Sequence, residues 1–276
     1  MKLSLCNEVL RHLSFEDQCR VTAALGCTGL EVAPFTLSDD PRTLTAADAK
    51  RLARVAADHG LAISSLHWLL VAPEGLSLST PDDALHTRTV DFLKHLIDLA
   101  AAFGADAMVH GSHKQRSPWP GQSVAEALAR AEHGWAQLAP HAAAAGVVYC
   151  IEPLSPNETN VLNTVEEAAA VVDRIGSPAM RTMIDLSAAA QSEKRPPHEV
   201  TAQYLASGHI AHVQVNDRNR RGPGQGETPV APLLRVLKQA GYAGWIAIEP
   251  FDYYPDPMAC AAASAGHVRG ILEALP

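Results

Sequence analysis

The segment Val147-Val148-Tyr149-Cys150-Ile151-Glu152-Pro153 is an apolar run that ends in an acidic residue and a proline. Close to the end of the chain, Trp245-Ile246-Ala247-Ile248-Glu249-Pro250 repeats this pattern. Short apolar runs bounded by a turn residue are typical of strands buried in a parallel sheet. Glu152 and Glu249 are therefore each expected at the carboxyl end of such a strand.

Short apolar runs and longer amphipathic stretches alternate along the whole chain. The apolar runs predict eight strands, at residues 2–7, 29–33, 62–67, 107–110, 147–152, 181–185, 210–216 and 245–249. The stretches between them place apolar residues at three- and four-residue spacing, which predicts helices. Several of these helices end in a glycine suited to a C-cap: Gly60, Gly104, Gly146, Gly176 and Gly241. Strands that alternate with helices indicate a parallel sheet.

Eight such units within 276 residues favour an α/β fold with one closed (β/α)8 barrel, a TIM barrel, over an open doubly wound sheet. An open sheet usually shows a glycine-rich turn after its first strand, and none follows residues 2–7. No low-complexity linker divides the chain, so a single domain over residues 1–276 is expected. The charged, glycine-rich stretch 217–229 follows the seventh strand, which in a barrel places it at the catalytic face.

Charge and composition argue against several classes of protein. With 30 acidic and 22 basic residues, the formal net charge of −8 disfavours nucleic-acid and anionic-membrane partners, which need clustered cations. No apolar run approaches the ~20 residues that span a bilayer, and the N-terminus lacks the apolar stretch of a signal peptide. The five cysteines show no C-x-x-C spacing. We expect a cytoplasmic protein that acts on a small molecule.

Polar residues mark the ends of seven predicted strands. They are Glu31, His67, His110, Glu152, Asp185, Gln214 and Glu249. The carboxyl ends of parallel strands meet at one mouth of a barrel, so all seven are expected there. Period-two alternation within residues 211–216 places His212, Gln214 and Asn216 on one face, and this face is expected to point inward.

Four of these residues are carboxylates, and three of them, Glu152, Asp185 and Glu249, end the fifth, sixth and eighth predicted strands. Carboxylates that face one another raise each other's pKa unless a cation neutralises them. Together with the amide oxygen of Gln214 they form an all-oxygen ligand set, which suits one divalent ion, Mn²⁺ or Mg²⁺, and lacks the His and Cys donors that favour zinc. The choice between the two metals stays open.

These motifs resemble the sugar isomerase/epimerase family of xylose isomerase-like TIM barrels, which includes ketose 3-epimerases and hydroxypyruvate isomerase. The resemblance covers nearly the whole chain and is most specific in residues 151–153, 183–185, 212–217, 220–226 and 241–251. It implies a metal bound by Glu152, Asp185, Gln214 and Glu249, with Glu152 and Glu249 as the acid/base pair. It also implies that Glu158 and Arg220 contact a sugar substrate, and that the protein forms a homodimer or homotetramer.

The family resemblance implies a sugar isomerase or epimerase that moves a proton through a metal-bound enediolate. Two positions depart from the ketose epimerases, which carry histidines where this chain has Gln214 and Ala188. Hydroxypyruvate isomerase also uses glutamine at the first position. The missing histidine at Ala188 keeps a lyase acting on a 3-keto sugar or glycoside as an alternative. Two further alternatives are an apurinic endonuclease, disfavoured by the acidic charge, and a sugar-binding barrel without activity, disfavoured by the intact ligand set.

Other residues are candidates for substrate binding, and each of them could instead have a purely structural role. His67 and His110 would bind sugar hydroxyls or be satisfied by nearby backbone groups. Trp68 would stack on a sugar or fill the core. Glu31 would hold a hydroxyl or pair with a cation. The basic stretches 114–116 and 218–221 would bind phosphate or remain solvated.

Overall fold

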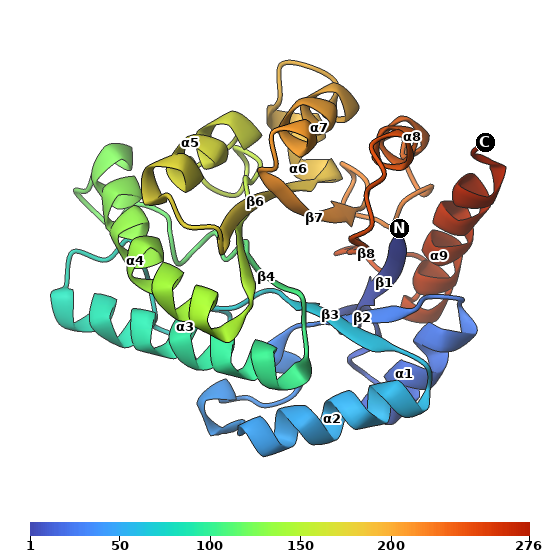
Figure 1. The fold of residues 1–276 in the computed structure, drawn as a ribbon, viewed down its shortest axis with the longest axis horizontal. Coiled ribbons are helices and arrows are strands. Elements are labelled where there is room, and N and C mark those ends of the chain that lie inside the picture. Colours follow the sequence, from blue (N-terminus) through green and yellow to red (C-terminus); the bar gives the residue numbers. More distant parts are fainter.

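The computed structural model describes all residues 1–276 and shows a closed barrel of eight parallel strands in sequence order. Figure 1 shows the helices as a ring outside these strands. The predicted (β/α)8 barrel is thus confirmed. The strands are β1 (Lys2–Cys6), β2 (Gly29–Val32), β3 (Ala62–Leu66), β4 (Ala107–His110), β5 (Val148–Ile151), β6 (Met180–Asp185), β7 (Ile210–Val215) and β8 (Trp245–Ile248).

The helices begin and end at residues that the local sequence specifies. Thr45, Ser123 and Thr164 each form a capping box with an acidic residue three positions later. Gly104 and Gly146 end two of the helices in the left-handed conformation that glycine adopts without strain. The helices are α1 (Phe15–Ala24), α2 (Ala46–Asp58), α3 (Asp83–Phe103), α4 (Val124–Ala145), α5 (Val165–Ile175), α6 (Leu186–Ser192), α7 (Pro197–Ala206), α8 (Ala231–Gln239) and α9 (Pro257–Ala274), with 3-10 turns η1 (Asn7–Leu10), η2 (Pro34–Thr36) and η3 (Pro41–Thr43).

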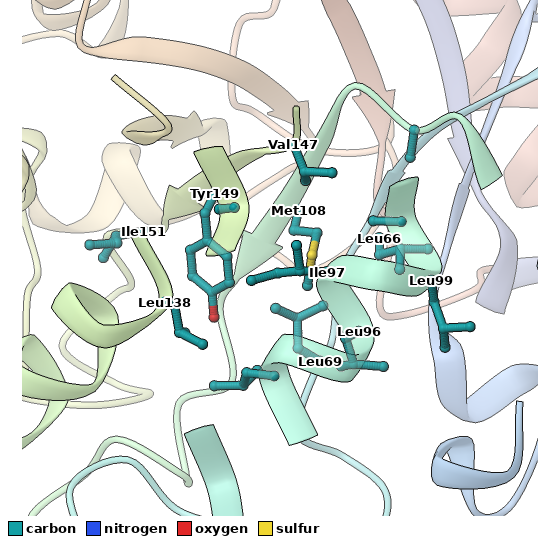
Figure 2. Close-up of a cluster of buried hydrophobic side chains, with 14 of the residues drawn as sticks. Leu66, Leu69, Leu96, Ile97, Leu99, Met108, Leu138, Val147, Tyr149 and Ile151 are labelled. Carbon is teal, nitrogen blue, oxygen red and sulfur yellow. The ribbon is translucent and has the colours of Figure 1, made fainter. Parts of the chain in front are cut away.

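Most of the hydrophobic core lies between the barrel and the helices. Figure 2 shows strand residues such as Met108 and Tyr149 beside Leu96 and Ile97 of α3. Their neighbours in sequence point the other way: Ala107, Val109, Cys150 and Met183 form a small cluster inside the barrel. Since side chains alternate along a strand, this phase fixes which residues reach the barrel mouth.

Two strands carry an extra residue that reverses the alternation. Between β2 and β3 the register skips Ser64, and between β6 and β7 it skips Ala211. A bulge of this kind shifts the side chains that follow it to the other face. Without the bulges, His67 and Gln214 would point to the helices; with them, both point into the barrel.

None of the helices combines the length and the apolar character needed to cross a membrane.

Candidate active site

Three buried carboxylates meet at the carboxyl ends of β5, β6 and β8. One oxygen each of Glu152, Asp185 and Glu249 lies within 4.8 Å of the others. Asp185 also caps α6, because its Oδ1 accepts the Ala188 N–H at 2.7 Å, and its Oδ2 accepts the Asn216 amide at 2.6 Å. These contacts fix Asp185 within the cluster.

Burial and mutual repulsion keep protons on these carboxylates. Burial raises the pKa of Glu152 well above its usual range, and the charges of Glu249 and Asp185 raise it further. Burial likewise raises the pKa of Glu249 to about 8 and that of Asp185 to about 7. Without a cation, ionisation of all three acids is therefore opposed, and a cation would displace the protons that they retain.

Gln214 offers an unpaired oxygen beside this cluster. It pairs with Asp185 in the register of β6 and β7, and its Nε2 donates to Glu31 Oε1 at 2.6 Å. A carboxylate only accepts, so the amide nitrogen must face Glu31. The Gln214 Oε1 is buried and has no hydrogen-bond partner. Three carboxylates and one free amide oxygen therefore fit a hard divalent cation.

Glu31 does not line the site as a substrate-binding residue, contrary to the sequence prediction. It is fully buried, and its oxygens contact Ser65 Oγ, His212 Nε2 at 2.6 Å and Gln214 Nε2. Burial by itself would raise its pKa, but the charges of His212 and His67, together with hydrogen bonds from His212 and Ser65, lower the pKa below its usual range. Glu31 thus fixes the orientation of the Gln214 amide through this hydrogen bond.

His67 lies between two carboxylates. Its Nδ1 is 2.9 Å from Glu249 Oε1, and its Nε2 is 2.8 Å from Glu8 Oε2. Burial opposes its protonation, but Glu8, Glu31 and Glu249 raise the pKa of His67 well above its usual range. His67 therefore holds the Glu249 carboxylate in place. The sequence analysis did not identify Glu8, which lies two residues after β1, although an acid close to the end of an apolar run was the signal that found Glu152 and Glu249.

His110 points away from the mouth, so its predicted place in the site is wrong. Val109 and Gly111 take the inward positions, and His110 packs against Trp135 of α4. Its Nδ1 is hydrogen-bonded to the Tyr149 hydroxyl at 2.6 Å. Burial lowers the pKa of His110 to about 3, which keeps the ring neutral.

Arg116, grouped in the sequence with a phosphate-binding stretch, is also buried. Its Nη1 donates to the His110 carbonyl oxygen at 3.2 Å, and no part of the side chain is exposed. Burial lowers the pKa of Arg116 to about 10, while Glu152 and Glu158 act in the opposite direction. Its charge in turn lowers the pKa of Glu152. Arg116 is therefore a buried counter-charge to Glu152 and not a surface phosphate ligand.

A cavity of about 210 Å³ opens above the carboxylates. Glu152 and Asp185 line it together with Glu158, Arg220 and Phe251. Glu158 accepts hydrogen bonds from the backbone N–H and the hydroxyl of Ser155. The Arg220 guanidinium lies 4.9 Å from the centre of the Phe251 ring. A volume below the ~300 Å³ of common ligand pockets suits a small molecule such as one sugar.

A second, smaller cavity of about 20 Å³ adjoins the first. His67, Trp68 and Glu249 line it. The Trp68 ring meets Phe251 edge-to-face, with the ring centres 6.0 Å apart. Trp68 therefore lines this smaller cavity beside His67 and Glu249, and its stacking on a sugar stays a prediction.

Gly111 leaves the space that Glu152 occupies. A Cβ added at Gly111 would collide with Glu152 Oε2, so Gly111→Ala must displace this carboxylate. We expect the substitution to lower the rate of the catalysed reaction about 10²-fold, since small misplacements of reacting groups have effects of that size. The rate and the melting temperature are measured together. Gly270→Ala, where a Cβ meets nothing within 4 Å, is the control and should keep full activity. An active Gly111→Ala enzyme would contradict a role for Glu152.

Polar groups gathered at the carboxyl ends of the strands of a closed parallel barrel define a TIM-barrel protein with an enzyme-like site. Residues 19–271 match the model of the xylose isomerase-like TIM barrel family, and the chain belongs to this family. The family predicted from the sequence motifs is thus confirmed.

Several of the proteins that this chain resembles are named as epimerases. The chain is 32% identical over 123 residues to a D-psicose 3-epimerase of Enterocloster bolteae. This aligned segment covers 45% of the chain and 40% of that relative. The chain is 27% identical over 238 residues to a D-psicose 3-epimerase of Agrobacterium fabrum, covering 83% of the chain and 76% of the relative. A 3-keto-D-glucoside 4-epimerase from E. coli shares the fold with a TM-score of 0.84 at 16% identity, covering 98% of the chain and 99% of the relative.

Proposed function

We propose that this protein is a divalent-metal-dependent sugar isomerase or epimerase. The observation that carries the proposal is the pair of buried glutamates, Glu152 and Glu249, which approach one small cavity from β5 and β8. Two carboxylates on different sides of a substrate are what a proton exchange at carbon requires. The epimerases among the relatives support this assignment.

The residues that would hold the metal are Glu152, Asp185, Gln214 and Glu249. Their oxygens suit Mn²⁺ or Mg²⁺, and the free Gln214 Oε1 and the raised pKa values of the three acids fit such an ion. When bound, the metal would act as a Lewis acid that makes the C–H next to a substrate carbonyl more acidic.

The protein's own groups would then move the proton. One glutamate of the pair removes the proton from the carbon next to the carbonyl, and the other returns a proton to the opposite face, which inverts that carbon. Return of the proton to the neighbouring carbon instead would make the enzyme an aldose–ketose isomerase. His67 fixes the orientation of the Glu249 carboxylate through the contact at 2.9 Å.

The surrounding residues would hold the sugar in place. Glu158 and Arg220 present an acceptor and a donor to its hydroxyls within the larger cavity. Trp68 and Phe251 offer apolar ring surfaces on the other side. Fixed contacts of this kind keep the reacting carbon close to the carboxylates.

The test is incubation of metal-loaded protein with a panel of ketoses in D₂O, followed by NMR. We expect deuterium at a carbon next to the carbonyl, together with a second sugar. No deuterium with either metal would reject the isomerase and the epimerase. A lyase is the second candidate, because Ala188 lines the cavity without any polar side-chain group. Release of water or an aglycone from a 3-keto glycoside would support the lyase.

A further inference from the structure

Glu8 is a buried acid outside the cluster of three carboxylates. It lies in the turn η1 that follows β1, and only 4% of its surface is exposed. Its Oε2 lies 2.8 Å from His67 Nε2, and its Oε1 has no hydrogen-bond partner. Burial of a carboxylate is costly unless the group is paired, and His67 is the one residue with which Glu8 forms an ion pair. The position of Glu8 is therefore tied to that of His67.

Glu8 lies outside both cavities of the site. His67 and Glu249 line the smaller cavity, whereas Glu8 lines neither this cavity nor the larger one. The His67 ring stands between the two acids, because its Nδ1 is 2.9 Å from Glu249 Oε1 while its Nε2 faces Glu8. Glu8 can therefore act on the reacting groups only through the His67 ring.

The contact with Glu8 selects one orientation of this ring. The His67 backbone N–H donates to the Val32 carbonyl oxygen at 3.1 Å, which fixes the main chain but not the ring. The last torsion of a histidine side chain is broad and roughly two-fold, so the ring can also lie half a turn away. In that second orientation ring carbons would take the places of both nitrogens, and neither Glu8 nor Glu249 would meet a hydrogen-bond donor. Glu8 thus favours the orientation that directs Nδ1 at Glu249.

Glu249 by itself is a poor anchor for His67. As a proposed metal ligand and proton carrier, Glu249 changes its partners during the reaction. Glu31 Oε1 also lies 3.4 Å from His67 Nδ1, and it competes with Glu249 for this nitrogen. Because Glu8 lies outside both cavities, its contact with Nε2 is the same at every stage of the reaction.

We propose that Glu8 is a positioning residue, which holds the His67 ring so that the ring keeps Glu249 in its place among the carboxylates. The inference rests on the proposed function and adds a residue to its site. Groups that orient the ligands of a metal typically contribute about 10- to 100-fold in activity or in metal affinity.

The test compares Glu8→Leu with Glu8→Gln in the metal-loaded enzyme, on the sugar that the D₂O panel identifies as a substrate. At saturating Mn²⁺ we expect Glu8→Leu to lower kcat about 10- to 100-fold with little change in KM, because leucine offers the His67 ring no acceptor. Glu8→Gln should keep most of the wild-type kcat, since its amide has both a donor and an acceptor for Nε2. Titration with Mn²⁺ alone is the second readout, and Glu8→Leu should weaken Mn²⁺ binding about 10-fold.

Asn7→Ala is the matched control. Asn7 precedes Glu8 in the same turn and is also buried. Its side chain donates to Gln18 and Thr36 and accepts the Ala33 N–H, and none of these contacts involves His67. We expect Asn7→Ala to lower the melting temperature and to keep both kcat and the Mn²⁺ affinity, which separates the orientation of His67 from the stability of the turn.

Unchanged kcat and Mn²⁺ affinity in Glu8→Leu would overturn the proposal, and so would an equal loss in Glu8→Gln or in Asn7→Ala. A loss in KM alone would also reject it, because Glu8 would then act on sugar binding. If the wild-type protein exchanges deuterium into no sugar, the proposed function fails, and the Mn²⁺ titrations decide about Glu8 alone. If Glu8→Leu does not fold, Glu8→Asp replaces it with the same expectations, since its carboxylate is one methylene too short to reach His67.

Discussion

Glu249→Gln is expected to lower the rate of substrate conversion about 10²- to 10⁴-fold, the range found when a general acid or base is removed. The amide keeps the shape of the side chain, but it neither accepts nor returns a proton at neutral pH. Glu152→Gln should show a loss of similar size, because inversion needs a group on each face. NMR of the sugar products measures both rates. A Glu249→Gln enzyme with the full rate would contradict the acid/base assignment.

The fold of the Glu249→Gln variant provides the control for this result. Burial raises the pKa of Glu249 to about 8, so the metal-free wild-type protein already carries a neutral side chain there at pH 7. Glutamine mimics that neutral state, and we expect the melting temperature of the metal-free variant to equal or exceed that of the wild type. A large decrease would mean that the lost activity reports unfolding.

The metal-free protein is expected to lose stability as the pH rises from about 4 to about 8. Unfolded Asp and Glu have pKa values of about 3.9 and 4.3, whereas burial raises those of Asp185 and Glu249 to about 7 and about 8. The folded state then binds more protons than the unfolded state, so the free energy of unfolding falls with pH across this interval. The stabilisation from these bound protons is complete at pH values below the unfolded pKa values. It is lost as the pH rises through the folded pKa values.

Melting temperatures at several pH values, with a chelator and with Mn²⁺, measure this effect. A bound cation should raise the melting temperature most at the upper end of the interval, where the carboxylates are ionised. Asp185→Asn should reduce both the change of melting temperature with pH and the increase in melting temperature that Mn²⁺ causes. A metal-free protein whose melting temperature does not change with pH would contradict the buried-carboxylate cluster.

The barrel could be predicted because its signals are local. Apolar runs, helix caps such as Ser123 and Thr164, and glycine C-caps each act within a few residues. The strand-end position of Glu152 and Glu249 follows from the same short-range pattern. The acid/base and metal-ligand roles of these two residues are predictions.

The sequence predictions were wrong where the direction of a side chain depends on residues far away in the chain. His110 was expected at the mouth, but the phase of β4 turns it towards Trp135 and Tyr149. Glu31 was expected to meet the substrate, but Ser65, His212 and Gln214 surround it. Residue type alone does not separate a buried partner from a residue that lines a cavity.

The sequence by itself determined the eight-unit barrel, the ends of its strands and the acidic residues that follow them, since strand and helix periodicity is encoded within each segment. Only the tertiary structure revealed the bulges at Ser64 and Ala211, which give His67 and Gln214 the inward direction that the sequence predicted. It also decided that Glu8 lies against His67. Register and burial arise from pairing between segments far apart in the chain, and no local pattern records that pairing.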